Sequence, residues 1–148
     1  MAKIHRNAQA VWEGPLDKGN GTLTTGSKVL TDQPYTWKMR TEDVPGTNPE
    51  ELIGAAHAGC FNMEFSFLLT DAGHAPEKLD TKATVTFEPK QGGGFKISKI
   101  KLDVTGKVPG MSEEQFKDLA DKASKSCPVS GLLRPGLEEL ELVAQLAK

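Results

Sequence analysis

The chain has 148 residues and a mass of 16.0 kDa, which predicts one domain over residues 1–148. Hydrophobic residues make up 37% and charged residues 26%, a balance typical of folded globular proteins that excludes a disordered chain. Lysine and arginine total 18 against 20 aspartates and glutamates, a net charge of −2 that excludes the broadly basic surface of an electrostatic nucleic-acid binder.

Short strands are predicted over residues 8–40, where Gly, Pro and Asn mark turns between apolar segments. Aromatic and apolar side chains alternate with polar ones through residues 35–40, YTWKMR, which is the period of a half-buried strand. This alternation places Arg40 on the polar face of that strand, as a solvated charge.

A long helix is predicted to begin after Asn48, which suits the N-cap, with Pro49 at the first helical position. Glu51 completes a capping box, and the helix is expected to end near Gly73. Residues 52–69 are apolar almost all round, which predicts a central helix buried on most sides. The run is long enough to cross a membrane, but polar side chains that are costly in lipid interrupt it: His57, Asn62, Glu64 and Ser66.

Two stripes are expected along this helix, one apolar and one polar. The apolar stripe holds Ile53, Ala56, Cys60, Met63 and Phe67. The polar stripe, expected to face water or a partner, holds Glu50, His57, Glu64 and Asp71.

The second half of the chain predicts a hairpin, a helix and a final strand. The hairpin covers residues 79–107, and a one-residue phase shift in its return strand indicates a β-bulge. The helix starts with a capping box of Ser112 and Gln115, and Pro128 ends it near Cys127. With a strand over residues 137–146, the order of elements predicts an α+β fold with a mainly antiparallel sheet packed on the long central helix.

Two cysteines, Cys60 and Cys127, are too few for a disulfide-rich secreted scaffold. The first residues, MAKIHR, lack the apolar core of a signal peptide, so a cytoplasmic protein with reduced thiols is expected. Both cysteines are explained most simply as small buried hydrophobes. A nucleophilic Cys60 would need a nearby cation, because a free thiol with a pKa of about 8.5 is only a few per cent thiolate at neutral pH.

Other chemistries find little support in the sequence. A zinc site formed by His57, Cys60 and Cys127 would lack a fourth ligand and the usual spacing, so we expect no metal. The chain has no phosphate-binding loop, dinucleotide fingerprint or nucleophile elbow, and no cofactor is expected.

Two separated motifs carry a family resemblance. Residues 46–61, GTNPEELIGAAHAGCF, together with residues 127–130, CPVS, closely resemble the OsmC/Ohr family of thiol-dependent peroxidases. The likeness extends over nearly the whole chain and includes residues 10–14, AVWEG. The early glycine-rich stretch lacks the arginine of the Ohr branch, whereas Arg40 matches the arginine of the OsmC branch.

The resemblance implies a role for each of four residues. Cys60 matches the peroxidatic cysteine and Cys127 the resolving cysteine. Arg40 matches the arginine that holds the thiolate, and Glu50 the carboxylate that orients this arginine. An arginine that lowers the thiol pKa by two units must supply about 2.7 kcal/mol. One departure is Glu64, which stands where a small or apolar residue is expected.

The resemblance also implies an organic hydroperoxide as substrate, a dithiol such as a dihydrolipoyl group as reductant, and an OsmC/Ohr-like fold assembled as an intertwined homodimer. Ten helical residues separate Glu50 from Cys60 by about 15 Å, which favours sites shared between chains. No nucleic-acid or membrane partner is expected. Two alternatives stay open: a redox sensor that oxidises slowly, and a module of the same fold that binds an apolar ligand.

Overall fold

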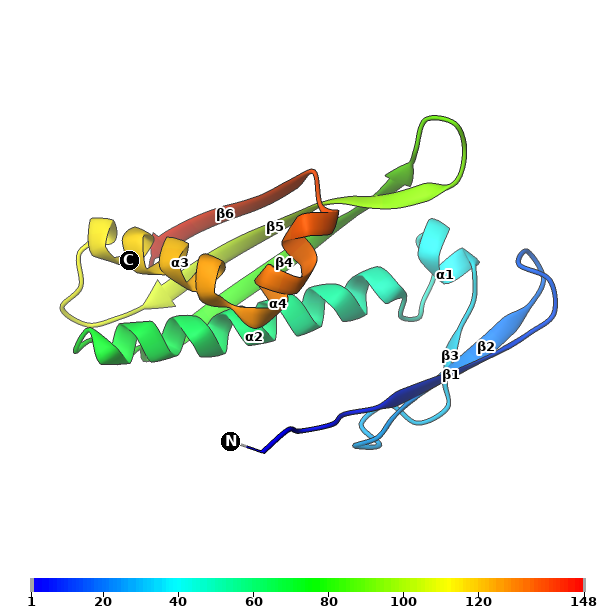
Figure 1. Ribbon diagram of the computed structural model, residues 1–148, viewed down its shortest axis with the longest axis horizontal. Coiled ribbons are helices and arrows are strands. Elements are labelled where there is room, and N and C mark those ends of the chain that lie inside the picture. Colours follow the sequence, from blue (N-terminus) through cyan, green and yellow to red (C-terminus); the bar gives the residue numbers. More distant parts are fainter. Residues whose placement is uncertain (1, 148) are drawn as a thin grey trace. The chain divides into compact units, whose positions relative to one another are not determined.

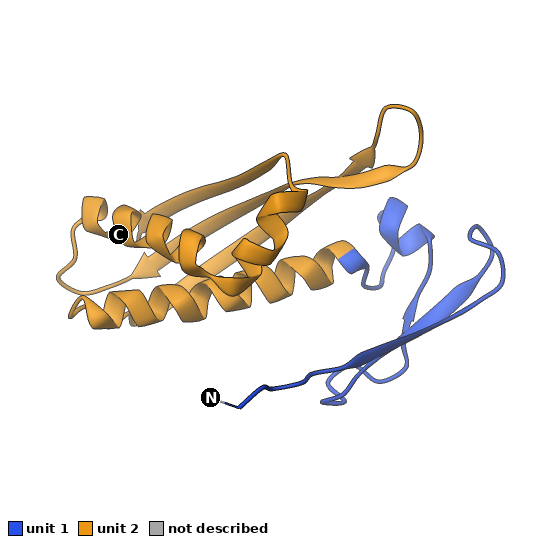
Figure 2. Cartoon of the chain, in the orientation of Figure 1, with its two compact units in different colours: residues 1–49 blue, residues 50–148 orange. Residues whose placement is uncertain are grey.

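The computed structural model describes residues 2–147 and divides into two compact units, residues 1–49 and residues 50–148 (Figure 2). The N-terminal unit holds three strands and one helical turn, and the C-terminal unit holds a second sheet with the remaining helices (Figure 1).

The N-terminal unit is an antiparallel sheet in the order β1 (Ala8–Glu13), β2 (Asn20–Thr25) and β3 (Gln33–Tyr35), followed by α1 (Lys38–Thr41). These strands confirm the prediction of short strands and turns over residues 8–35. The predicted strand over residues 35–40 is wrong, because the chain turns into α1 and Arg40 lies in a helical turn. The side chain of Thr36 accepts a hydrogen bond from the backbone N–H of Met39 at 3.3 Å, and such local bonds divert a chain from extended pairing.

The C-terminal unit contains β4 (Lys78–Pro89), β5 (Phe95–Lys107) and β6 (Glu139–Leu146), in the order β4-β5-β6. The predicted hairpin is confirmed, and its register shifts at Thr86/Phe87, where Ser98 is the extra residue of the predicted bulge. β6 pairs with β5 in parallel, since helices connect the two strands. The α+β class is confirmed, with two small sheets in place of one.

The helices of this unit are α2 (Pro49–Asp71), α3 (Glu113–Ser126) and α4 (Pro128–Leu133), followed by the short 3₁₀ turn η1 (Arg134–Gly136). The predicted starts of α2 and α3 are confirmed, and α3 carries the complete capping box of Ser112 and Gln115. The predicted end of the second helix near Cys127 is confirmed, whereas α4 was not predicted from the sequence.

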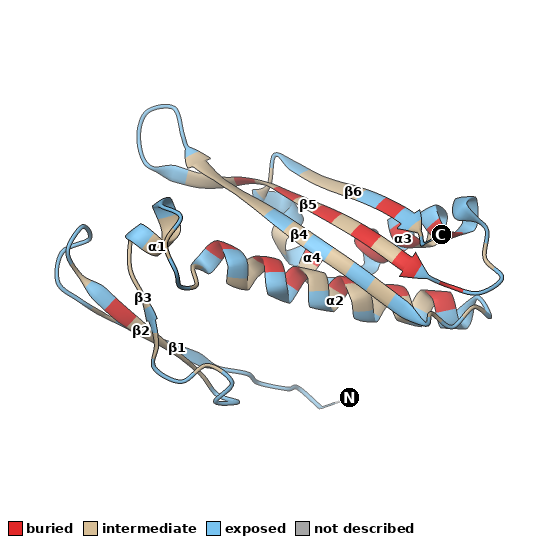
Figure 3. Cartoon of the chain, turned by 180° about the vertical axis from the view of Figure 1, so that it is seen from behind, coloured by how far each residue is buried: buried red, intermediate tan, exposed pale blue. Residues whose placement is uncertain are grey.

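The core of the C-terminal unit lies between one face of the sheet and the helices (Figures 1 and 3). Alternate residues of β5, Ile100, Leu102 and Val104, are buried there. The ring of Phe116 packs so closely on β5 that a Cβ at Gly106 would lie 2.4 Å from it, so this position requires glycine.

α2 is buried along a single stripe formed by Gly54, His57, Phe61, Phe65 and Leu69. Three members of the expected apolar stripe with Cys60, namely Ala56, Met63 and Phe67, are exposed in the single chain. The expected polar stripe is wrong at Glu50 and His57, which are buried. The single chain does not bury α2 on most sides.

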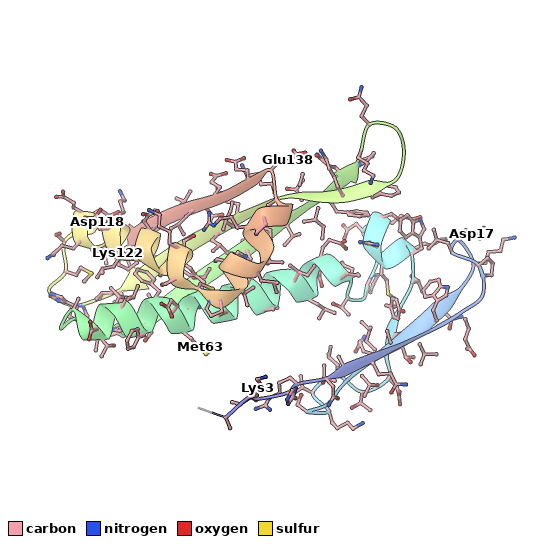
Figure 4. All side chains as sticks on the ribbon, in the orientation of Figure 1. Lys3, Asp17, Met63, Asp118, Lys122 and Glu138 are labelled. Carbon is pink, nitrogen blue, oxygen red and sulfur yellow. The ribbon has the colours of Figure 1, made fainter. Side chains whose placement is uncertain are left out.

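The exposed side of α2 is apolar. Met63 is 71% and Phe67 63% exposed, and Figure 4 shows Met63 on the side of α2 that points away from its sheet. α2 is long and apolar enough to cross a membrane, with a mean hydropathy of 1.2. The core helix of a soluble protein meets the same criteria, so these properties alone do not identify a membrane span. Its buried stripe joins the core cluster, as in such a core helix.

Candidate active site

The two cysteines, 67 positions apart in sequence, meet in the C-terminal unit. The Sγ atom of Cys60, in the middle of α2, lies 3.3 Å from the Sγ atom of Cys127, between α3 and α4. Both are free thiols, with Cys127 buried and Cys60 half-buried. A disulfide requires a sulfur separation of about 2.05 Å, so a displacement of little more than 1 Å would join them.

A break between two helices holds Cys127 in this position. Its backbone N–H makes the last hydrogen bond of α3, to Ala123 at 2.8 Å, and its carbonyl accepts the first bond of α4, from Gly131 at 3.0 Å. Pro128 disfavours helical geometry at the preceding residue, and Cys127 adopts φ −58° and ψ 121°. The motif that ends one helix and starts the next therefore turns the thiol towards α2.

Two polar contacts flank the sulfur pair. His57 Nε2 and Ser130 Oγ lie 2.7 Å apart on one side, and the hydroxyl of Ser126 donates to the carboxylate of Glu64 on the other. Positions 57, 60 and 64 share one face of α2, because their spacing is close to one and two helical turns. The segment from the last residue of α3 into α4 thus contacts this face at three successive points, through Ser126, Cys127 and Ser130.

The surroundings of Cys60 within this unit oppose ionisation of its thiol. Burial raises the pKa of Cys60 above its usual value, and Cys127 and the negative charge of Glu64 raise it further. A hydrogen bond from the backbone of Val129 acts in the opposite direction. A reactive thiolate at Cys60 therefore needs a cation that these neighbours do not supply.

Replacing Glu64 with glutamine is expected to lower the pKa of Cys60 and to speed its alkylation at pH 7 a few-fold, because a negative charge that disfavours the thiolate is removed. The pH profile of iodoacetamide labelling measures this in a Cys127→Ser background, where Cys60 is the single thiol. Asp71→Asn, at the exposed end of the same helix, is the matched control. If the midpoint of the labelling profile of Glu64→Gln lay at the same or a higher pH, the charge of Glu64 would not raise the pKa of Cys60.

His57 is fully buried, and its Nδ1 atom has no hydrogen-bond partner within residues 2–147. Burial lowers the pKa of His57, and the positive charge of Arg134 lowers it further. The guanidinium of Arg134 donates to the carbonyl of Ser124 at 3.0 Å, which ties η1 to the last turn of α3. His57 is therefore held in its neutral form.

The free energy of unfolding is expected to fall as the pH drops below about 6.5, because His57 binds a proton in the unfolded chain but stays neutral in the native chain. Above that pH both states are neutral at this residue, so the effect is absent. The slope contributed is at most about 1.4 kcal/mol per pH unit. Urea unfolding between pH 5 and 8 measures it, and His57→Gln should flatten the curve; equal slopes in both proteins would contradict the assignment.

The other two predicted site residues, Glu50 and Arg40, belong to different parts of the chain from the sulfur pair. Glu50 is buried in the first turn of α2, about 15 Å along the axis from Cys60. Arg40 belongs to the N-terminal unit, where its guanidinium carbon lies 5.9 Å from the centroid of the Trp37 ring. The thiol pair thus comes from one unit and Arg40 from the other.

Arg40 also lines a pocket of about 290 Å³ within the N-terminal unit. The other lining residues are mostly aromatic or apolar: Trp12, Leu16, Tyr35, Thr36, Trp37 and Pro49. A single cation on an apolar wall suits a ligand with an apolar body and a polar end.

Sequence reasoning missed three residues around the sulfurs: Ser126, Val129 and Ser130. Val129 and Ser130 belong to the CPVS motif, which was the available signal, but their partners on α2, Cys60 and His57, are more than sixty positions away. Within residues 2–147 no group of three His, Cys, Asp or Glu side chains could hold a metal ion.

The family described as OsmC-like protein matches residues 40–138. Peroxiredoxin OsmC of Escherichia coli is 47% identical over 131 residues, which cover 88% of this chain and 91% of the relative. An organic hydroperoxide resistance protein of Xanthomonas axonopodis pv. citri is 34% identical over 98 residues, covering 63% of each chain.

Solved structures share the fold at lower identity. An organic hydroperoxide resistance protein from Elizabethkingia anophelis superposes with a TM-score of 0.76 at 23% identity, covering 99% of this chain and 100% of that one. OhrB of Bacillus subtilis gives a TM-score of 0.71 at 23% identity, covering 95% and 98%. These structures confirm the OsmC/Ohr-like fold expected from the two motifs.

Proposed function

Because the chain belongs to the family of OsmC-like proteins, we propose that it is a thiol-dependent peroxidase that reduces organic hydroperoxides to alcohols. One observation carries the proposal: the two thiols of the chain lie 3.3 Å apart, within reach of a disulfide. The names of the relatives, peroxiredoxin and organic hydroperoxide resistance protein, support the same chemistry.

In the proposed reaction the Cys60 thiolate attacks one oxygen of the hydroperoxide. The O–O bond breaks, the organic oxygen leaves as an alkoxide that takes a proton to become the alcohol, and Cys60 becomes a sulfenic acid. The sulfur of Cys127 then attacks the Cys60 sulfur, forming a disulfide and releasing water. An external dithiol restores both thiols by exchange and is itself oxidised to a disulfide.

Arg40 is proposed as the cation that the neighbours of Cys60 do not supply. A guanidinium beside the thiol favours the thiolate and can stabilise the departing alkoxide. Glu50, proposed to orient Arg40, lies about 15 Å along α2 from Cys60, so either Arg40 spans this distance or the Glu50 that orients it belongs to the partner chain. The family resemblance and the need for a positive charge at Cys60 support both roles.

The proposed substrates are alkyl or fatty-acid hydroperoxides rather than hydrogen peroxide. The pocket beside Arg40 offers mostly apolar and aromatic walls, which favour a ligand with a hydrocarbon body. For the reductant we propose a dihydrolipoyl group, on the family resemblance. We also propose a cytoplasmic location, where the free thiols of this chain stay reduced between turnovers.

The working protein is proposed to be an intertwined homodimer with shared sites. The exposed apolar side chains of α2, Met63 and Phe67, support this proposal, because exposed apolar patches of this kind mark association surfaces. Sedimentation equilibrium should give about twice 16.0 kDa. A 16.0 kDa monomer with full peroxidase activity would contradict the shared site.

Rapid mixing of the reduced protein with tert-butyl hydroperoxide or hydrogen peroxide tests the function. We expect fast loss of two thiols per chain, with the organic peroxide reacting at least about tenfold faster, since an apolar wall binds its alkyl group. Cys127→Ser should lose one thiol and accumulate sulfenic acid. Slow oxidation at equal rates by both peroxides would contradict a peroxidase and support the redox-sensor alternative.

A further inference from the structure

His57 and Ser130 form a buried contact that the reaction described above does not use. Both residues are fully buried, and His57 Nε2 lies 2.7 Å from Ser130 Oγ. His57 precedes Cys60 on α2 by three residues, close to one helical turn. The contact therefore fixes α4 to the same face of α2 that carries Cys60.

Ser130 also reaches the other sulfur. Its backbone N–H donates to Cys127 Sγ at 3.5 Å, so its side chain is held by α2 while its backbone holds the thiol. These contacts form a closed ring of four residues. His57 and Cys60 are linked through α2, His57 contacts Ser130, Ser130 contacts Cys127, and Cys127 lies 3.3 Å from Cys60. Moving any one of them changes the separation of the two sulfurs.

The buried contact between His57 and Ser130 should hold this geometry better than the exposed hydrogen bond between Ser126 and Glu64. Ser126 and Glu64 lie where water competes for their hydrogen bond, whereas His57 and Ser130 have no such competitor. The imidazole also has a buried Nδ1 without a partner within residues 2–147, whichever tautomer it adopts. A buried nitrogen left in this way is unfavourable and invites a functional explanation.

We propose that His57 and Ser130 are positioning residues for the resolving step, holding Cys127 Sγ against Cys60 so that the sulfenic acid is converted to a disulfide before it can react further. The inference rests on the proposed function, because it presumes that Cys60 is oxidised first. In the resolving step the Cys127 sulfur bonds to the Cys60 sulfur, the S–O bond breaks and water leaves. A sulfur misplaced by about 1 Å can slow such an intramolecular step by up to about a hundredfold.

Ser130→Ala separates the two steps of the reaction. With one equivalent of tert-butyl hydroperoxide, we expect oxidation of Cys60 within about twofold of the unaltered protein, while disulfide formation slows about tenfold or more. Dimedone labelling followed by mass spectrometry should then capture the Cys60 sulfenic acid. Ser126→Ala, the same change on the other side of Cys127, is the matched control and should resolve at nearly the normal rate.

His57→Gln is the second variant, because the glutamine amide can occupy the position of Nε2 and keep the bond to Ser130. It should resolve faster than Ser130→Ala. Normal disulfide formation in Ser130→Ala, or equal slowing in Ser126→Ala, would overturn the positioning role. Failure of Cys60 to oxidise in the unaltered protein would instead overturn the proposed function, so the two failures are distinguishable.

Discussion

Cys60→Ser should abolish hydroperoxide turnover, with a loss on the order of a thousandfold or more, because a serine hydroxyl is not ionised at neutral pH and is a far weaker nucleophile than a thiolate. Consumption of tert-butyl hydroperoxide in the presence of dithiothreitol measures the loss. The substitution replaces one sulfur with oxygen at a half-buried position, so the fold should be retained.

The matched control makes the same change at the other cysteine. Cys127→Ser removes the resolving sulfur and leaves the attacking one, so it should still consume one equivalent of peroxide per chain in a single turnover. Cys60→Ser should consume none. If Cys60→Ser kept normal turnover, or if Cys127→Ser alone lost the first oxidation, the roles assigned to the two cysteines would be wrong.

Arg40→Ala is expected to slow the reaction with hydroperoxide at pH 7 by about a hundredfold, the effect of raising the thiol pKa by about two units. Within the C-terminal unit, burial, Cys127 and Glu64 already raise the pKa of Cys60, so loss of the proposed cation would leave little thiolate. The rate in the variant should then climb about tenfold per pH unit until the thiol ionises.

Stopped-flow rates between pH 5 and 10 measure this profile. Arg6→Ala is the matched control, since Arg6 is an exposed arginine of the same N-terminal unit. Arg40→Lys should recover part of the rate, because the positive charge is kept while the planar guanidinium is lost. An Arg40→Ala profile equal to that of the unaltered protein would remove Arg40 from the site.

Local signals predicted the elements that carry the site. Pro49 marked the start of α2, Ser112 and Gln115 marked the start of α3, and Pro128 marked the break that holds Cys127. Each of these signals acts between residues close in sequence, through caps and through the steric effect of proline. The positions of both cysteines on their elements followed from them.

Contacts between distant segments could not be predicted in this way. The 3.3 Å approach of Cys60 and Cys127 depends on how α4 packs on α2, and the sequence pattern alone left both thiols as candidates for simple packing. The helix period also misplaced His57, which is buried because Ser130 satisfies its Nε2 atom. A polar side chain that finds a buried partner cannot be told from a solvated one by spacing alone.

The strand predicted over residues 35–40 failed for a related reason. Its alternation of aromatic and polar side chains is real, but it spans only six residues, and the bond between Thr36 and Met39 starts α1 instead. A short alternating run fits either structure when one side-chain contact can redirect the backbone.

The most direct test of the central claim is a single turnover of the reduced protein with one equivalent of tert-butyl hydroperoxide, followed by peptide mapping without reduction. The account predicts that both thiols disappear and that one disulfide joins Cys60 to Cys127 within a chain, with one equivalent of alcohol released. Recovery of both free thiols with the peroxide unconsumed would contradict it.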